Sequence, residues 1–302
     1  MKKTFKSIII TAIFIMVLIA SSVMTAFADT TYVLDGYTYS VSDNISISLR
    51  NWDTSVNTTL TLPDMLANRY FTEVGNWALE NCANLDGVDF SNATHLKRIG
   101  YESFINCSGI ATDLVLPESV ETLSVRSFSG CTSIPSITIN GNVSEIPSEC
   151  FYGCTAVTEV VLPDSLHTIQ AWAFGGCANL EYIEIPVSVT NIAVSAFLND
   201  PNLTLGVWYG TTGYDYAIAQ NIPYILLDGV KLGDANGDGI VNINDVTAIQ
   251  QHLAEYVFLE GISLHAADAD QNGEVKIDDA TLLQEFLAEY TVGHPVGEVM
   301  TQ

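Results

Sequence analysis

A short motif with a central phenylalanine, followed by a cysteine in four of its five copies, recurs along the middle of this chain at an almost constant spacing. Its copies read ESFINC, RSFSGC, ECFYGC, WAFGGC and SAFLND, and their phenylalanines are Phe104, Phe128, Phe151, Phe174 and Phe197. The sequence numbers of these phenylalanines advance by 24 once and then by 23 three times. Periods of about 20 to 45 residues are typical of solenoids, because a single coil cannot bury its apolar face without a neighbouring coil. The middle of the chain is therefore predicted to be a repeat solenoid.

A second apolar track advances with the same period and predicts the strands of that solenoid. It reads LVLPESV, ITINGNV, VVLPDSL and IEIPVSV. In one unit Leu180, Ile183 and Ile185 form an L-x-x-I-x-I core before a proline-containing turn, which predicts short parallel strands joined by loop and turn segments. Because side chains alternate along a strand, the same frame places a set of residues on the outer face: Asp113, Val115, Ser136, Thr138, Glu159, Val161, Tyr182 and Glu184.

These units resemble the BspA-type leucine-rich repeat family over roughly residues 45–227. Looser early units surround NWALENC, and the closing YAIAQNIPYILLD is similar to that family's end cap. The resemblance implies a leucine-rich repeat solenoid with N- and C-terminal caps, which we place at residues 29–228.

Six cysteines follow the same repeat. One repeat position holds Cys82, Cys107, Cys131, Cys154 and Cys177, and Cys150 takes a slot that other units fill with Ser103, Ser127, Ala173 and Ala196. Equivalent positions of a solenoid form a column, in which a small apolar thiol packs well. We therefore expect buried, structural cysteines. Disulfides between neighbouring rungs are the alternative, because six cysteines in an exported chain also fit three bridges.

The stretch DANGDGIVNIND, residues 234–245, has the spacing of a calcium-binding loop. Oxygen-bearing side chains stand at loop positions one, three, five, nine and twelve, as Asp234, Asn236, Asp238, Asn242 and Asp245. Calcium takes six to eight oxygen ligands, and a glycine at position six allows the sharp turn that wraps the ion. Gly239 occupies that position. The backbone carbonyl of Ile240 is expected to be a further ligand, with the isoleucine side chain directed into the core.

The same pattern returns further along the chain as DADQNGEVKIDD, residues 268–279. Its predicted side-chain ligands are Asp268, Asp270, Asn272 and Asp279, and Glu274 is expected to contribute its backbone carbonyl. Lys276 stands at the ninth position, where a side-chain oxygen or a water is usual, so this second site is expected to be weaker or to use an extra water. The sequence therefore predicts two calcium sites.

Each loop is followed by a segment with helical periodicity, VTAIQQHLAEY after the first and ATLLQEFLAEY after the second. The segment LLDGVKLG before the first loop carries two glycines and is not helical, so the entering helix of an EF-hand is missing. Two loop–helix units in tandem resemble the type I dockerin family over residues 233 to about 292. The resemblance implies a small all-α calcium-binding domain of two loop–helix units, which we place at residues 229–302, and a cohesin module of a scaffoldin as its partner.

In that family the recognition residues lie just before the twelfth loop position and midway along the exiting helix. The matching residues of this chain are Ile243, Asn244, Gln250, Gln251, Ile277, Asp278, Gln284 and Glu285. The family often has Ser-Thr at the first pair, whereas this chain has Ile-Asn and Ile-Asp, so the resemblance does not carry partner specificity over. The similarity of the two halves would permit docking in either of two orientations.

The segment 1–28 has the features of a secretory signal peptide. Lysines at positions 2, 3 and 6 precede an apolar run, and AFA provides a small-x-small cleavage site before Asp29. A retained membrane anchor is the alternative, although the run from Ile8 to Ala20 is short for a span of about 20 residues. Removing the signal takes three lysines from 10 basic residues and leaves 7 against 35 acids, a net charge near −28. Such a charge disfavours nucleic acid and anionic membranes as partners.

No catalytic pattern stands out in the sequence. The histidines His95, His167, His252, His265 and His294 are scattered, and neither a serine elbow nor a zinc-protease helix motif is present. We therefore predict a secreted, non-catalytic component of a cell-surface, polysaccharide-degrading complex, in which the solenoid recognises a protein or polysaccharide ligand. An unfamiliar polysaccharide-active hydrolase and an adhesin or spacer are the alternatives. Trp172 and Trp208 could form a sugar-binding platform or simply pack.

Overall fold

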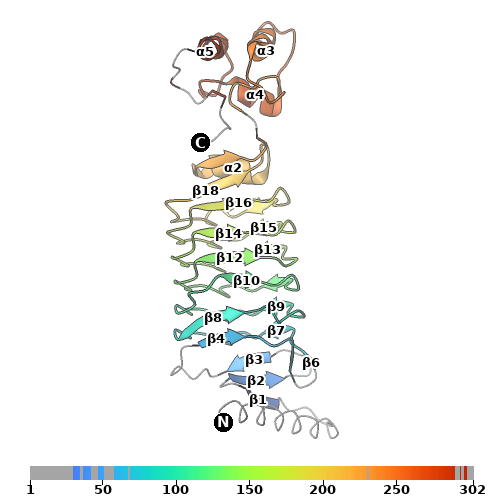
Figure 1. Ribbon diagram of the computed structural model, residues 1–302, viewed down its shortest axis with the longest axis vertical. Helices are drawn as coiled ribbons and strands as arrows, with labels where there is room; N and C mark the ends of the chain where they lie inside the picture. Colours follow the sequence, from blue (N-terminus) through green and yellow to red (C-terminus); the bar gives the residue numbers. More distant parts are fainter. Residues whose placement is uncertain are drawn as a thin grey trace, which may run out of the picture.

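The computed structural model describes residues 30–34, 37–41, 47–50, 58–66, 69–229, 231–289, 293 and 296–297. The predicted signal peptide lies outside these residues. Strands are stacked along the long axis of the molecule, and a group of helices follows the last strand at one end (Figure 1). Within the described residues, no helix is both long and apolar enough to cross a membrane.

A six-stranded parallel sheet forms one side of the solenoid. Its strands, in spatial order, are β10 (Leu114–Leu116), β12 (Ser136–Ile139), β14 (Glu159–Val161), β16 (Tyr182–Glu184), β18 (Thr204–Val207) and β19 (Tyr224–Leu226). Ile137 pairs with Val160, and Val160 with Ile183, so equivalent repeat positions stand in register. These are the strands that the L-x-x-I-x-I core predicts, and Leu180, Ile183 and Ile185 are buried.

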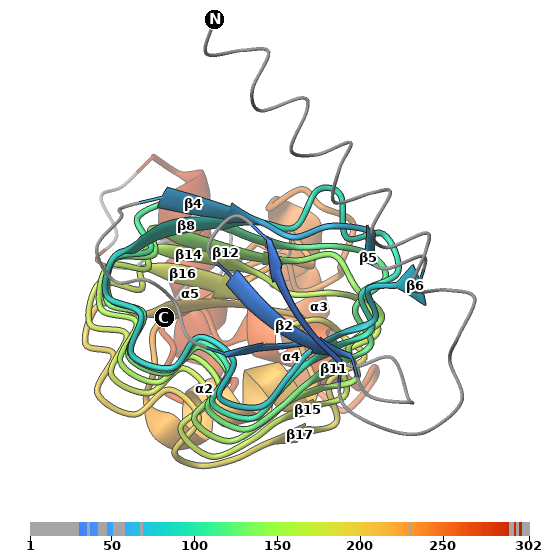
Figure 2. The same ribbon diagram turned by 90° about the horizontal axis from the view of Figure 1, so that it is seen from below.

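Shorter strands form the opposite side of each coil (Figure 2). They are β7 (Glu73–Val74), β9 (Arg98–Ile99), β11 (Thr122–Leu123), β13 (Glu145–Ile146), β15 (Thr168–Ile169) and β17 (Asn191–Ile192). The pair β4 (Thr58–Thr61) and β8 (Leu85–Asp89) is also parallel. Coils therefore have strands on two sides, although the repeat pattern predicts only the longer set.

Antiparallel strands precede the regular coils. β1 (Thr30–Leu34), β2 (Tyr37–Val41) and β3 (Ile47–Arg50) pair in sequence order, and β3 joins β7 in parallel. A two-stranded antiparallel pair, β5 (Met65–Leu66) and β6 (Arg69–Tyr70), branches off nearby. The regular 23-residue repeat does not predict this change of strand direction, because its phenylalanine motif first appears at Phe104, after these strands.

The core of the solenoid contains two columns that follow the repeat. The rings of Phe104, Phe128, Phe151, Phe174 and Phe197 are stacked nearly parallel, with centroids 4.9, 5.6, 5.4 and 5.4 Å apart. All six cysteines are buried as free thiols, and most donate to a main-chain carbonyl of a preceding coil, as from the sulfur of Cys154 to Phe128 at 3.3 Å. The predicted buried cysteine column is thus present in the structure.

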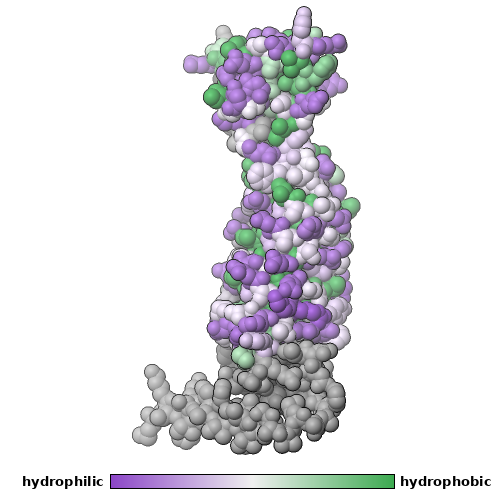
Figure 3. Space-filling model, turned by 90° about the vertical axis from the view of Figure 1, so that its right-hand side faces the viewer, coloured by the Kyte–Doolittle hydropathy of each residue, from purple (hydrophilic) through white to green (hydrophobic). Residues whose placement is uncertain are grey.

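The residues expected to form the end cap contain α2 (Thr212–Gln220) and β19. Beyond it lie α3 (Ile243–Leu253), α4 (Gly261–Ala267) and α5 (Ile277–Leu287), and α4 has no counterpart in the sequence prediction. A separate small core, which includes Val246, Ile249 and Leu283, holds α3 against α5. Figure 3 shows hydrophobic and hydrophilic side chains interspersed on this helical part.

Candidate functional site

The loop of residues 234–245 folds around its own acidic side chains. Asp245 at the start of α3 accepts from the backbone N–H groups of Asn236 at 3.0 Å and Asn242 at 2.7 Å. Asp234 accepts from those of Asp238 at 3.1 Å and Gly239 at 2.9 Å. The first and last residues of the loop therefore hold its backbone in a closed turn, and their carboxylates lie inside that turn.

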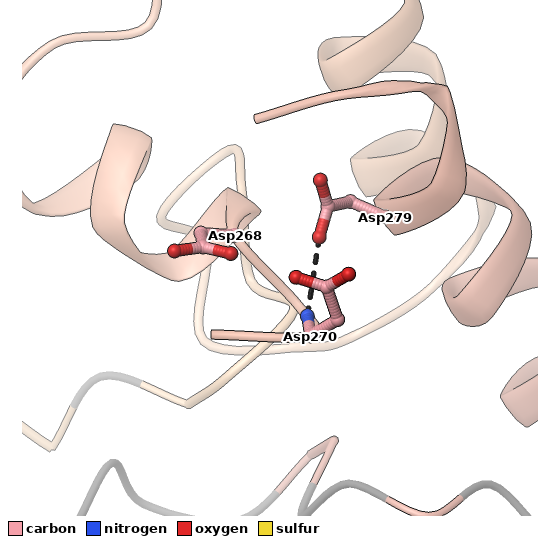
Figure 4. A group of neighbouring side chains, drawn as sticks. All are labelled: Asp268, Asp270 and Asp279. Carbon is pink, nitrogen blue, oxygen red and sulfur yellow. Dashed lines mark hydrogen bonds between the residues drawn. The ribbon is translucent and has the colours of Figure 1, made fainter. Parts of the chain in front are cut away.

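The loop of residues 268–279 repeats this arrangement. Asp279 accepts from the N–H groups of Asp270 at 3.1 Å and Lys276 at 2.7 Å, and Asp268 accepts from those of Asn272 at 3.0 Å and Gly273 at 2.7 Å. Figure 4 shows Asp268, Asp270 and Asp279 directed toward one another. One oxygen from each lies within 4.8 Å of the others, which is the spacing of a cation site.

Glycine at the sixth position of each loop makes the sharp turn. Gly239 and Gly273 have φ of +83° and +89°, and no heavy atom lies near the position that a Cβ would take. Only glycine adopts this region of positive φ without strain. The glycine that the sequence pattern requires at position six is therefore the residue that the backbone conformation requires.

Burial disfavours the charged forms of two loop aspartates. It raises the pKa of Asp245 and of Asp268 above the usual range for an aspartate, and neighbouring loop carboxylates add to both effects. A cation held between these oxygens would stabilise their charged forms. Carboxylate, amide and carbonyl oxygens are the ligands that calcium prefers, so the residues present fit this ion.

One sequence expectation about the first loop is wrong. The side chain of Ile240 is 64% exposed and does not enter the core. Val241 and Val275, one residue further along each loop, pack against the small helical core instead. Successive side chains of an extended segment point in opposite directions, so the ligand carbonyl and the core side chain belong to adjacent residues.

The ninth position differs between the two loops. Asn242 is the N-cap of α3, where its side-chain oxygen accepts from the N–H of Asn244 at 2.8 Å and its amide donates to the carbonyl of Ile240 at 2.9 Å. Lys276 instead forms an ion pair with the side chain of Glu274. Its ammonium group cannot be a metal ligand, so any ligand at this position of the second loop must come from elsewhere.

The predicted recognition residues all lie at the surface of the helical part. Ile243 and Ile277, at the first positions of α3 and α5, are each 59% exposed although both are large and apolar. The other six residues of the set are also exposed. Sequence reasoning missed the neighbouring apolar segment between α3 and α4, where Tyr256 and Phe258 are exposed.

The outer face of the large sheet carries the side chains that alternation predicts. Asp113, Val115, Glu159, Val161 and Glu184 are exposed, and Ser136, Thr138 and Tyr182 are partly exposed. Trp208, which follows β18, lies beside this face and is partly exposed, whereas Trp172 packs edge-on against Tyr152. A recognition surface on the solenoid would therefore combine acidic, hydroxyl, aliphatic and aromatic side chains.

This fold is a leucine-rich repeat solenoid followed by a small helical domain with acidic loops. A model of the BspA type leucine rich repeat region matches six copies within residues 57–112 and 72–204, and a model of the dockerin type I domain matches residues 232–288. The chain therefore contains a BspA-type leucine-rich repeat region and a C-terminal type I dockerin domain. Type I dockerin domains bind calcium and imply docking onto a cohesin in a cellulosome-like complex, and leucine-rich repeats imply protein interaction.

Solved structures with a similar chain trace are also leucine-rich repeat proteins. A leucine rich cell surface protein of Faecalibacterium prausnitzii is 22% identical with a TM-score of 0.47, and the match covers 61% of this chain and 56% of that one. A leucine-rich repeat protein of T. pallidum is 24% identical with a TM-score of 0.49, covering 59% and 81%. This chain thus spans little more than half the length of the first of them. No curated protein matches the chain significantly.

Proposed function

We propose that this protein is an exported component of a polysaccharide-degrading complex. Its residues 229–302 bind two calcium ions and dock onto a cohesin module of a scaffoldin, and its residues 29–228 recognise a ligand beside that complex. The observation that carries the proposal is the duplicated loop, since in both copies the first and last aspartates bind four backbone N–H groups at equivalent loop positions.

The two calcium sites share a ligand plan. In the first loop the ligands are Asp234, Asn236, Asp238, the carbonyl of Ile240, Asn242 and Asp245. In the second they are Asp268, Asp270, Asn272, the carbonyl of Glu274 and Asp279. Calcium supplies the positive charge that lets these acidic side chains lie close together, and the ordered loops then fix the starts of α3 and α5.

The docking surface follows from the positions of α3 and α5. Both helices begin with an exposed isoleucine and carry exposed amides one to two turns later, at Gln250 and Gln284. Exposed apolar residues next to polar ones are typical of protein interfaces. Because the two helices present matching residues, either could lead when the domain meets a cohesin.

Paired substitutions test both the docking surface and its symmetry. Ile243→Ala with Gln250→Ala, then Ile277→Ala with Gln284→Ala, then all four together, should be titrated by calorimetry against a panel of type I cohesin modules in calcium. We expect modest, comparable losses from either pair and loss of binding in the fourfold variant. Ile218→Ala is the matched control, because this isoleucine of α2 is also half exposed but lies on the solenoid.

Each outcome decides between specific alternatives. Loss of binding from one pair alone would mean a single orientation, and full binding by the fourfold variant would overturn the proposed surface. If no cohesin binds the unmodified protein in calcium, the docking function itself is wrong.

A further inference from the structure

The outer face of the large sheet is hollowed near its C-terminal end. A groove of about 310 Å³ lies over β14 and β16 and beside the residues that follow β18. Its walls include Glu159, Val161, Tyr182, Glu184 and Trp208, with Asp164 at one margin. This volume is at the lower end of the range for ligand sites, and it suits one long side chain with its flanking backbone.

The strand register builds the groove. Glu159 lies beside Tyr182 on the neighbouring strand, and Glu184 lies beside Gly206 of β18. A Cβ atom at position 206 would lie only 2.2 Å from the hydroxyl oxygen of Tyr182, so the tyrosine lies across the glycine. The missing side chain at Gly206 therefore accommodates the ring of Tyr182, which in turn lines the groove.

Trp208 is held at the end of the groove by the cap of α2. Its backbone carbonyl accepts from the hydroxyl of Thr211 at 2.7 Å and from the N–H of the same residue at 3.2 Å. Thr211 is in turn the N-cap of α2. The indole is thus attached to an ordered turn, which reduces the entropy that a ligand must remove on binding.

The groove carries uncompensated negative charge. Glu159, Asp164 and Glu184 line it, and in the described part of the chain none of them forms an ion pair. The arginine and lysine ion pairs of the solenoid join other carboxylates in other coils: Lys97 with Glu121, Arg98 with Glu73, and Arg126 with Glu102 and Glu149. A ligand for the groove should therefore bring positive charge with it.

We propose that this groove binds an arginine or lysine side chain presented by a protein partner. A guanidinium or ammonium group can pair with Glu159 and Glu184 and lie against the face of Trp208 or Tyr182 as a cation–π contact. A neutral saccharide could stack on the same rings but would leave three carboxylates without a counter-charge. The proposal rests on the proposed recognition function of the solenoid and adds the location and the chemistry of the ligand.

Peptide binding by the whole mature chain tests this proposal. The probes are fluorescent Gly-Ser octapeptides with a central arginine, lysine or citrulline, measured by anisotropy in calcium. Citrulline keeps the shape of arginine without its charge. We expect arginine and lysine peptides to bind at least about tenfold more tightly than the citrulline peptide, because charge-assisted and cation–π contacts are lost together. Added salt should weaken their binding.

Variants locate the site. Glu184→Gln and Trp208→Ala should each reduce arginine-peptide binding by about tenfold, and Trp208→Phe should restore part of it. Glu145→Gln is the matched control, because Glu145 is an exposed carboxylate on β13, away from the large sheet. Equal binding of the citrulline peptide, or an equal loss in Glu145→Gln, would overturn the proposal.

Two further measurements separate this proposal from the proposed function. Cohesin binding should be unchanged in Glu184→Gln and Trp208→Ala, because the docking residues lie on α3 and α5. If a cello-oligosaccharide binds in a Trp208-dependent way while the arginine peptides do not, the groove is a sugar site and the cationic-ligand proposal is wrong. In that result cohesin docking would still stand, so the two failures are distinguishable.

Discussion

The solenoid and the dockerin domain are both internal repeats, but different forces hold them together. In the solenoid each copy adds a phenylalanine to a stacked column, and every copy but the last adds a thiol to a buried column, so the repeat itself supplies the core. In the dockerin domain the copies supply acidic loops, and only a small core joins the helices. A repeat can therefore provide either core packing or metal ligands. Only the stability that comes from metal ligands depends on the calcium concentration of the solvent.

The solenoid and the dockerin domain also differ in how their acidic residues are neutralised. The segment 233–302 holds 13 acids and a single lysine. Acids in the solenoid coils partly pair with basic residues, as around Arg126, which contacts both Glu102 and Glu149. The first and last aspartates of each dockerin loop are buried instead and form no ion pair within the described residues. This contrast predicts that the two regions respond to different treatments.

Calcium removal should give the largest effect. In excess EDTA the protein should lose most of the helical circular dichroism of α3, α4 and α5, because the loop carboxylates then repel one another and the starts of the helices are no longer fixed. The strand signal of the solenoid should remain. Unchanged ellipticity at 222 nm in chelator would show that the helical domain folds without metal and would remove the contrast.

Substitutions in the loops refine this test. Asp234→Ala and Asp268→Ala each remove a buried charged ligand and should weaken calcium binding by at least about tenfold, as measured by titration against a competing chelator. Lys276→Ala removes only the ion pair with Glu274 and should leave affinity nearly unchanged or raise it. A loss in Lys276→Ala as large as in Asp268→Ala would contradict the ligand assignment.

A core substitution should affect only the solenoid. Phe151 is fully buried between two stacked rings, so Phe151→Ala should lower the free energy of unfolding by about 3 to 5 kcal/mol. Calcium affinity should not change. Tyr152→Ala is the matched control, because this neighbouring aromatic residue is 40% exposed, and it should cost about 1 kcal/mol. Equal losses of unfolding free energy in the two variants, measured by urea unfolding, would show that the stacked phenylalanine column contributes no more than a partly exposed aromatic residue.

The thiols should be unreactive in the folded protein. Burial raises the pKa of Cys131 and of Cys150 to about 12, so at pH 8 these groups are both inaccessible and protonated. Iodoacetamide should label few cysteines in the native chain and all six after unfolding without reductant, as counted by mass spectrometry. Three thiol pairs that resist labelling until reduction would mean disulfides and would contradict the free-thiol column.

The sequence predicted the structure best at positions where a single physical requirement determines the residue type. The phenylalanine column, the inward Ile183 and the glycine turns at Gly239 and Gly273 all follow from burial or φ requirements that no other residue type meets as well. It did not predict α4, whose short sequence lacks a capping side chain, or the short second set of strands. Such brief strands depend on neighbouring coils and leave no local pattern.

The groove shows the same limit. Alternation places Tyr182 and Glu184 outward, but the position of the Tyr182 ring in the groove wall depends on Gly206 of the neighbouring strand, over which the ring lies. A glycine in a strand does not by itself predict which side chain of a neighbouring strand lies over it. Sites made by register between coils therefore need the three-dimensional structure, whereas sites made within one loop can be predicted from spacing.

The last and smallest expected effect is a pH dependence of the stability of the solenoid. It comes from the one repeat unit in which the cysteine column is interrupted. Asp200 lies one repeat after Cys177 and so takes the cysteine position of the last coil. Both of its carboxylate oxygens are buried without a hydrogen-bond partner among the described residues. Burial raises the pKa of Asp200 to about 7, and the nearby backbone N–H groups of Cys177 and Gly176 offset only part of the effect. A protonated carboxyl could donate to a carbonyl as the thiols do, whereas a carboxylate could not.

The stability of the solenoid should therefore fall as pH rises from about 4 to about 7 and then level off, because the folded state holds the proton of Asp200 through a range in which the unfolded state has lost it. Urea unfolding of the solenoid transition in saturating calcium, at pH 5 and pH 8, measures this contribution. Asp200→Asn keeps the shape and a donor without the titration, so its stability should exceed that of the unmodified protein by more at pH 8 than at pH 5. Parallel pH dependences in the two proteins would show that Asp200 does not hold a proton in the folded solenoid.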